Sequence, residues 1–155
     1  MKYAELRHSA AHVLASAVKE LFPGAKLAIG PAIDEGFYYD FDFRTFTNED
    51  LERISKKMQE IINKNLQFKK TKKTRKEAKE ILKNEPYKLE LLEGLNDDIT
   101  FYSHGDFQDL CKGPHVKSTG EIKSFKLLKT SGSYWKGNSK NKQLQRIYGT
   151  AFPSK

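Results

Sequence analysis

Two pairs of potential metal-binding side chains with the same spacing are the residues in this sequence best suited to chemistry. His8 and His12 lie four positions apart near the N-terminus, and Cys111 and His115 lie four positions apart later in the chain. Because residues i and i+4 share one face of a helix, both imidazoles of the first pair can reach one point. Together the pairs offer three imidazole nitrogens and one sulfur. This is the donor set of a tetrahedral zinc site or of a hydrolytic site.

Polar neighbours of Cys111 extend this candidate site. Asp109, two residues before the cysteine, is placed either to orient a histidine or bind a substrate ammonium, or simply to cap a turn. Lys112 and a nearby imidazolium would favour the thiolate form of Cys111. A Gly-Pro turn between Cys111 and His115 can bend the two side chains toward one centre.

Residues 4–21 form the clearest predicted helix, which must position the histidine pair. Its apolar residues recur at helical spacing on one face, and Pro23 follows its end. His8 and His12 project away from this apolar face, so they are either exposed or line a cleft against another segment. The apolar face comprises Leu6, Ala10, Val13, Leu14, Ala17, Val18 and Leu21.

The rest of the chain predicts an α+β fold with a largely antiparallel sheet, on which the long N-terminal helix and further helices pack. Thr47 is a plausible N-cap for a second helix, and Thr74 with Glu77 forms a capping box that opens a third helix, through Lys83. We expect strands at 26–33, 36–43, 66–70, 87–92, 100–104, 124–130 and 144–152.

Length and composition predict one globular domain covering residues 1–155. The 155 residues are 37% hydrophobic, which is enough apolar material for a core and excludes disorder as the main state. There is no apolar run of about 18 residues and no signal-peptide pattern, so we expect no membrane contact. A single cysteine excludes an internal disulfide framework and suits the reducing cytoplasm.

The net charge of +8 is concentrated at the C-terminal end. Residues 1–111 hold 18 basic and 19 acidic residues, whereas residues 112–155 hold 10 basic residues and one acid. Basic residues interleaved with aromatics indicate a surface for a polyanion such as RNA, the alternative being a merely soluble basic surface. In this block Trp135 either stacks on a base or packs on the sheet. A second basic cluster at 69–83 also contains two glutamates and is more typical of a solvated helix.

Several motifs, in order along almost the whole chain, resemble the editing domain of threonyl-tRNA synthetases, the second additional domain shared with alanyl-tRNA synthetases. They are RHSAAH at 7–12, IGP at 29–31, GFYYD at 36–40, CKGPH at 111–115, SYWKG at 133–137 and LQRIYGTA at 144–151. The alanyl branch usually carries Gly-Gly-Thr-His after its cysteine, where this chain has Lys-Gly-Pro-His. The threonyl branch is therefore the better match.

The resemblance implies hydrolysis of mischarged Ser-tRNA(Thr), with the acceptor end of tRNA(Thr) as partner. It implies a catalytic set of His8, His12, Asp109, Cys111 and His115 and a substrate-binding set of Lys88, Tyr39 and Tyr102. For each tyrosine, ordinary core packing is the alternative. Phosphates would be bound by Lys123, Lys126, Lys129, Lys136, Lys140, Lys142 and Arg146. The chain has no room for a class II catalytic core, so we expect either an excised domain acting with the rest of the synthetase or a free-standing deacylase.

Zinc is not required by this interpretation, although His8, His12, Cys111 and His115 are candidate ligands. Three alternatives stay open. The first is a structural-zinc RNA-binding module without hydrolytic activity, and the second is an alanyl-type deacylase. The third is an unrelated zinc hydrolase acting on a small acidic substrate. The first histidine pair has no accompanying glutamate base inside the motif, which argues against a zinc protease.

Overall fold

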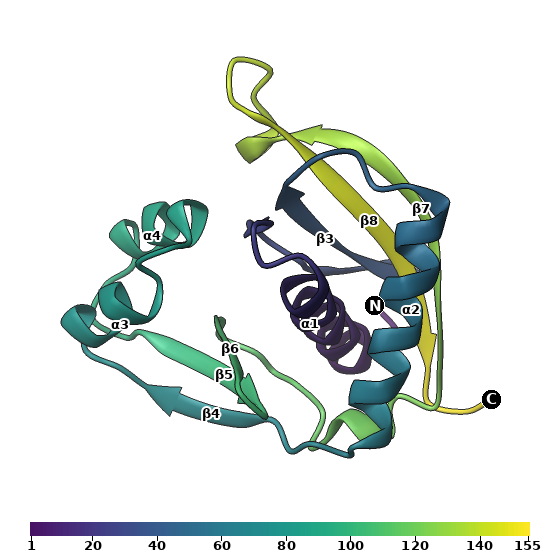
Figure 1. Ribbon diagram of the computed structural model, residues 1–155. Helices are drawn as coiled ribbons and strands as arrows, with labels where there is room; N and C mark the ends of the chain where they lie inside the picture. Colours follow the sequence, from purple (N-terminus) through teal and green to yellow (C-terminus); the bar gives the residue numbers. More distant parts are fainter.

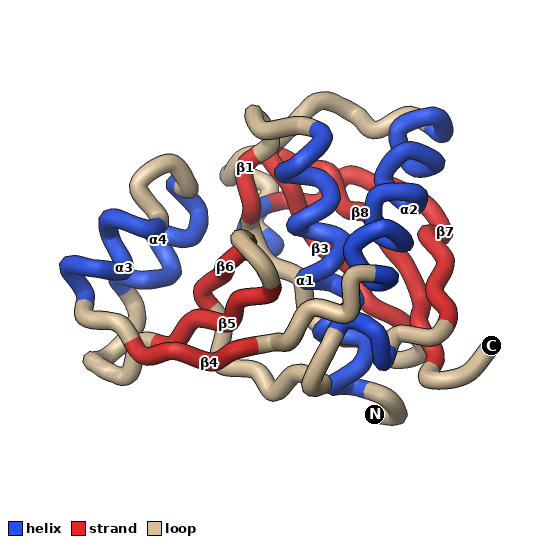
Figure 2. The backbone as a smooth tube through the Cα atoms, turned by 60° about the horizontal axis from the view of Figure 1, so that its bottom comes forward, coloured by secondary structure: helices blue, strands red, loops and turns tan.

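The computed structural model describes all 155 residues, and its elements form two groups on either side of helix α1 (Ala4–Leu21). The larger group holds helix α2 and a five-stranded sheet, and the smaller group holds helices α3 and α4 and a three-stranded sheet. Figure 1 shows α1 between the two groups, and Figure 2 shows the same separation from a second direction. A helix enclosed in this way presents side chains to both groups at once.

The larger sheet is antiparallel throughout. Its strands are β1 (Lys26–Leu27), β2 (Ala32–Ile33), β3 (Gly36–Asp42), β7 (Ser124–Tyr134) and β8 (Gln143–Phe152). Their order is β1-β3-β8-β7, with β2 also paired to β3. Alternate residues of β3 face the main hydrophobic core, which lies between this sheet, α1 and α2. The buried β3 residues on that inner face are Phe37, Tyr39 and Phe41.

Helix α2 (Asn48–Asn63) begins at a complete capping box. The hydroxyl of Thr47 accepts from the Asp50 amide, and the Asp50 carboxylate accepts from the Thr47 amide. Ile54 and Met58 lie four residues apart and are both fully buried in the core shared with α1. The predicted N-cap of this helix is confirmed.

The smaller group comprises β4 (Lys69–Lys72), α3 (Arg75–Ile81), α4 (Pro86–Glu93), β5 (Thr100–His104) and β6 (Phe107–Leu110). Its strands pair antiparallel in the order β4-β5-β6. The two helices cover one face of this sheet through a small separate core. That core consists of Ala78, Leu82, Leu92, Ile99 and Phe101.

The α+β fold class and the antiparallel pairing are confirmed, but several elements differ from the sequence prediction. Residues 87–92, expected to be a strand, form α4 instead, because Pro86 occupies the first turn and Lys88 and Leu92 share one buried helical face. The expected strand at 26–33 is split into β1 and β2, β4 begins three residues later than the expected strand at 66–70, and β6 was not predicted. Single 3-10 turns at Thr119–Glu121 and Trp135–Gly137 flank β7.

Helix α1 is buried on nearly every side from Leu6 to Val18. Its histidine face therefore lines a contact with the smaller group, which is the second of the two arrangements that its amphipathic pattern allowed. None of the helices combines the length and the apolar character that crossing a bilayer requires.

Candidate active site

The structure brings both predicted donor pairs to one point. His8 and His12 project from α1, and Cys111 and His115 lie in the segment that follows β6. One donor atom of each residue can be chosen so that all four lie within 4.8 Å of one another. The Cys111 sulfur is 3.6 Å from Nε2 of His8 and 3.4 Å from Nε2 of His115. The His115 ring centre lies 4.3 Å from that of His12.

A glycine allows the Cys111–His115 segment to turn back toward α1. Gly113 has a φ of +76°, in the left-handed region that residues with a Cβ rarely adopt. A Cβ at this position would lie 2.5 Å from the Tyr102 ring. The Tyr102 ring centre in turn lies 4.5 Å from that of His115. The close packing of Gly113 on Tyr102 thus forms one wall of the site.

The hydroxyl of Ser9 determines which nitrogen of His115 carries the proton. Ser9 Oγ lies 2.8 Å from the carbonyl oxygen of Glu5, which can only accept, so the single hydroxyl proton is donated there. The Val116 amide donates to the same oxygen at 3.0 Å. Nδ1 of His115, at 2.9 Å from Ser9 Oγ, must then be a donor as well. Nε2 of His115 is left without a proton and faces the Cys111 sulfur.

Burial keeps the imidazoles and the thiol neutral at neutral pH. Desolvation lowers the pKa of His8, lowers that of His12 strongly, and lowers that of His115 to about 2. Burial also raises the pKa of Cys111 to about 11. The expected thiolate at Cys111 is therefore wrong, because desolvation outweighs the nearby positive charge and the neighbouring imidazoles are uncharged. The neutral thiol donates a proton toward Nε2 of His115.

A buried ion pair lies beside the cluster. Lys88 Nζ, from α4, is 3.0 Å from Asp109 Oδ1, and both side chains are less than 5% exposed. The hydroxyl of Tyr39 donates to Asp109 Oδ2 at 2.7 Å, and His12 Nε2 lies 3.6 Å from the same oxygen. Burial raises the pKa of Tyr39 well above its ordinary value, so it remains a donor. Asp109 thus joins β3, α4 and α1, whereas an exposed turn-capping role is not seen.

Gly30 packs against the ring of Tyr39, the residue that donates a hydrogen bond to Asp109. A Cβ at Gly30 would lie 2.0 Å from Cδ2 of the Tyr39 ring, so the ring packs directly on the glycine backbone. The following Pro31 and the preceding Ile29 accept backbone hydrogen bonds from β3 residues, which holds the segment against the strand. The IGP motif therefore has a physical function: it makes room for the tyrosine that holds Asp109.

Comparison with known proteins identifies the family of this site. Residues 99–148 match the family described as threonyl and alanyl tRNA synthetase second additional domain. The chain is 57% identical to threonine–tRNA ligases of Clostridium novyi and Clostridium tetani and 56% identical to that of Paraburkholderia phymatum, in each case over 97% of its own length. Residues 99–148 therefore match a domain family of threonyl and alanyl tRNA synthetases, and the whole chain is similar to part of threonine–tRNA ligases. The chain spans 24% of the length of each of these relatives.

The family match includes Tyr102, Asp109, Cys111 and His115. The remaining site residues lie outside it, in α1, in α4, in β3 and in the segment between β1 and β2. Two contributors were missed by sequence reasoning. Ser9 and Gly30 both lie inside motifs noted from the sequence, yet nothing in their spacing indicated a hydroxyl shared with Val116 or a backbone packed on Tyr39.

Part of the predicted phosphate-binding set lies away from the site. Adjacent strand residues point to opposite faces, so Asp40 faces the outer side of the larger sheet when Tyr39 faces the site. Arg146 is registered opposite Asp40 and binds its carboxylate at 2.8 and 3.0 Å, which places the arginine on the outer face. By the same pairing Lys129, opposite Tyr148, lies on that outer face, as does Lys126, opposite Thr150.

The remaining members of that set are exposed. Lys136, Lys140 and Lys142 lie in the connection between β7 and β8, whereas Lys123 directly precedes β7. Lys136 pairs with Glu90 at 2.9 Å, and Lys142 lies 3.9 Å from Asp42. Lys123 and Lys140 form no ion pair. Trp135 is buried, with its ring against Tyr87 and its indole N–H donating to Glu90 at 2.7 Å. Its observed role is packing, one of the two expected alternatives.

Proposed function

We propose that this domain hydrolyses the aminoacyl ester of mischarged Ser-tRNA(Thr). The observation that carries the proposal is the convergence of His8, His12, Cys111 and His115 beside the buried pair of Lys88 and Asp109. The tRNA synthetase family of the chain supplies the substrate class. Under this proposal the domain acts in the cytoplasm on the acceptor end of tRNA(Thr), together with the rest of a threonyl-tRNA synthetase.

The need for such an activity follows from the limits of binding selectivity. Serine lacks one methyl group of threonine, and one such group changes binding by about 1–3 kcal/mol, too little for accurate translation. A second site must therefore remove serine from the tRNA after the error. Because threonine is the larger residue, this second site must reject it through a wall placed against its extra methyl group.

The chemistry begins with a water molecule placed among the neutral imidazoles. As water attacks the ester carbonyl carbon, His8 takes a proton from it, since burial lowers the pKa of His8 and leaves a free base at neutral pH. The carbonyl electrons move onto oxygen, where the Lys88 ammonium stabilises the developing charge. Collapse of this adduct breaks the bond to the ribose oxygen, which receives the proton and leaves.

The other residues of the set position these groups. Asp109 holds Lys88 and Tyr39 in place, and the Ser9 contact fixes His115 so that its bare Nε2 accepts from the Cys111 thiol. Tyr102, half-exposed beside His115, forms a surface on which the terminal adenosine can stack.

The donor set fits a zinc ion. Zinc ligands lie about 2.0–2.3 Å from the metal in a tetrahedron, so neighbouring donor atoms are about 3.3–3.6 Å apart. The Cys111 sulfur meets this spacing with Nε2 of both His8 and His115. Ser9 would serve as the outer partner that orients a ligating His115. A bound zinc would supply a water of lowered pKa if one coordination position stayed open, and a purely structural centre if all four residues bound it.

The same convergence favours a second candidate function, a structural-zinc RNA-binding module, because four converging protein donors are typical of closed zinc sites. An alanyl-type deacylase is the third, since the matched family includes alanyl tRNA synthetases.

The three candidates separate in one set of deacylation assays on Ser-tRNA(Thr), Thr-tRNA(Thr) and Ala-tRNA(Ala), run with and without a chelator. The proposal predicts that serine is released from Ser-tRNA(Thr) much faster than the amino acids of the other two substrates, with or without the chelator. Selective loss of alanine would identify the alanyl type. Binding of tRNA without hydrolysis, together with unfolding by the chelator, would identify the structural module.

A further inference from the structure

A row of three side chains crosses the smaller sheet from its solvent edge to the centre of the site. Lys70 in β4 is registered opposite Tyr102 in β5, and Tyr102 is registered opposite Asp109 in β6. Directly opposed residues of antiparallel strands project from the same face of a sheet. Lys70 is therefore two strand spacings, or about 10 Å, from Asp109 along the backbone of the sheet, on the face that Tyr102 and Asp109 share.

Lys72 forms a second row on this face. It is registered opposite Thr100, whose hydroxyl donates to the carbonyl of Cys111 at 2.8 Å. The other face of the sheet carries Phe101 and is covered by α3 and α4. The side chains of Lys70 and Lys72 thus extend the site-facing surface outward to the solvent edge.

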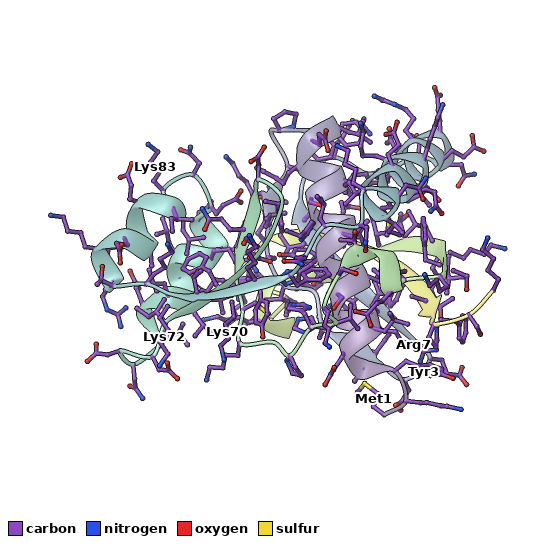
Figure 3. All side chains as sticks on the ribbon, turned by 90° about the horizontal axis from the view of Figure 1, so that it is seen from below. Met1, Tyr3, Arg7, Lys70, Lys72 and Lys83 are labelled. Carbon is purple, nitrogen blue, oxygen red and sulfur yellow. The ribbon has the colours of Figure 1, made fainter.

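These two lysines are available for a ligand. All of β4 is exposed, Lys70 forms no ion pair, and Lys72 has only a wide 3.7 Å approach to the exposed Asp98. Figure 3 shows both lysines at the edge of the molecule where Met1 and Tyr3 also lie, while Lys83 points to the opposite edge. The site opens toward the same end of α1, since His8 is half-exposed and His12, one turn further on, is buried.

We infer that Lys70 and Lys72 bind backbone phosphates of the single-stranded 3′ end of an RNA whose terminal ester enters the site. The inference rests on the proposed function. It differs from the expectation that basic residues of the C-terminal block bind these phosphates, because Lys126, Lys129 and Arg146 lie on the outer face of the other sheet. A flexible lysine offers a point charge for a phosphate without reading any base.

A competing explanation of the same lysines is protection of a sheet edge. β4 is an edge strand that pairs with β5 on one side, and charged side chains on such a strand prevent pairing with a second chain on the other side. The two explanations differ in what removal of the charges does. Edge protection predicts self-association, and phosphate binding predicts weaker and less salt-dependent RNA binding.

The test compares the double variant Lys70→Gln/Lys72→Gln with a charge-matched control, Lys56→Gln/Lys83→Gln, whose exposed lysines lie in α2 and after α3. The probe is an uncharged RNA hairpin carrying the tRNA(Thr) acceptor stem and its single-stranded 3′ extension, with a blunt hairpin beside it. Binding is measured by fluorescence anisotropy over a salt series. Wild-type hydrolysis of Ser-tRNA(Thr) is measured in parallel.

We expect Lys70→Gln/Lys72→Gln to bind the extended hairpin about five- to tenfold more weakly, with a salt slope reduced by roughly 1.4 for two single-strand contacts. The control variant should bind the extended hairpin as tightly as the wild type does. All three proteins should bind the blunt hairpin with the same affinity.

If the wild type hydrolyses no ester but Lys70→Gln/Lys72→Gln still weakens RNA binding, the inferred phosphate-binding surface is supported and the proposed function is contradicted. Unchanged RNA binding by the double variant, with or without self-association, would overturn the inference. A third variant, Lys126→Gln/Lys129→Gln, removes two lysines of the outer face of the larger sheet. Weaker RNA binding by this variant and not by Lys70→Gln/Lys72→Gln would also overturn the inference.

Discussion

The hydroxyl oxygen of Ser9 lies 2.9 Å from Nδ1 of His115 and accepts a hydrogen bond from its N–H, because the hydroxyl's own hydrogen bond is donated to the Glu5 carbonyl. This contact fixes one imidazole tautomer at the centre of the site. It also leaves Nε2 of His115 as an acceptor beside Cys111.

Ser9→Ala should lower Ser-tRNA(Thr) hydrolysis about tenfold, the lower end of the loss that follows removal of the outer partner of a metal-binding histidine. Long-range ¹H–¹⁵N NMR of His115 should show the Nδ1–H tautomer in the wild type and a mixture in the variant. Ser16→Ala is the matched control, because Ser16 makes the analogous contacts with Val13 and His104 outside the cluster. Equal loss of activity in both variants, or an Nε2–H tautomer in the wild type, would contradict the assignment.

The buried pair of Lys88 and Asp109 predicts a large stability effect. Lys88→Met leaves an unpaired carboxylate in the interior, so the free energy of unfolding should fall by about 3–5 kcal/mol. Adding Asp109→Asn removes the stranded charge and should restore part of that loss. Urea denaturation of both single variants and the double variant measures the coupling. A double variant less stable than Lys88→Met would show that the two charges do not stabilise each other.

The packing of Gly30 on Tyr39 predicts a position-specific steric effect. Gly30→Ala places a methyl group where the ring now lies, and it should destabilise the fold by at least about 2 kcal/mol while displacing the tyrosine from Asp109. Gly24→Ala has no neighbouring atom within 4 Å and should change stability by less than about 0.5 kcal/mol. Similar thermal unfolding of the two variants would argue against close packing of the Tyr39 ring on Gly30.

The capping box of α2 predicts a pH-dependent contribution to stability. Hydrogen bonds from Arg44 lower the pKa of Asp50 to about 2. A carboxyl group whose pKa is depressed by folding stabilises fully above its unfolded value, about 3.9, and that stabilisation is lost as pH falls through about 2. Asp50→Ala should therefore lower stability by about 1 kcal/mol at pH 7, with a smaller difference below pH 4.

The control for this prediction is Glu49→Ala, which removes an exposed first-turn carboxylate outside the capping box. It should have an effect of only a few tenths of a kcal/mol. Urea unfolding curves collected from pH 7 down to pH 2 compare the three proteins. A constant difference between wild type and Asp50→Ala over this range would show that the carboxylate does not act through its charge.

Sequence reasoning succeeded where a local period determined the geometry. The spacing of His8 and His12 and the Thr74–Glu77 capping box needed only helical periodicity, and both lie in helices as expected. Sequence reasoning failed where contacts between distant segments determine the secondary structure. Residues 87–92 form a helix that begins at Pro86 and buries the face of Lys88 and Leu92, and the partner of Lys88, Asp109, lies in a different element.

The placement of charge shows the same limit. Composition located the net positive charge in residues 112–155 but could not tell which face of a strand carries it. The register between β3 and β8 determines that Arg146 lies on the outer face. The register between β4 and β5 likewise brings Lys70, from a segment expected to be merely solvated, onto the surface that leads to the site.

The most direct test of the proposed deacylase activity is the single-turnover decay of Ser-tRNA(Thr) and Thr-tRNA(Thr) with the wild-type chain and with His8→Ala. We predict that the wild type releases serine far faster than threonine and that His8→Ala, while still folded, reduces serine release at least about 100-fold. Serine release that is unaffected by His8→Ala would contradict the assigned base. No release by a folded wild-type chain that binds tRNA would contradict the claim that this site is a deacylase.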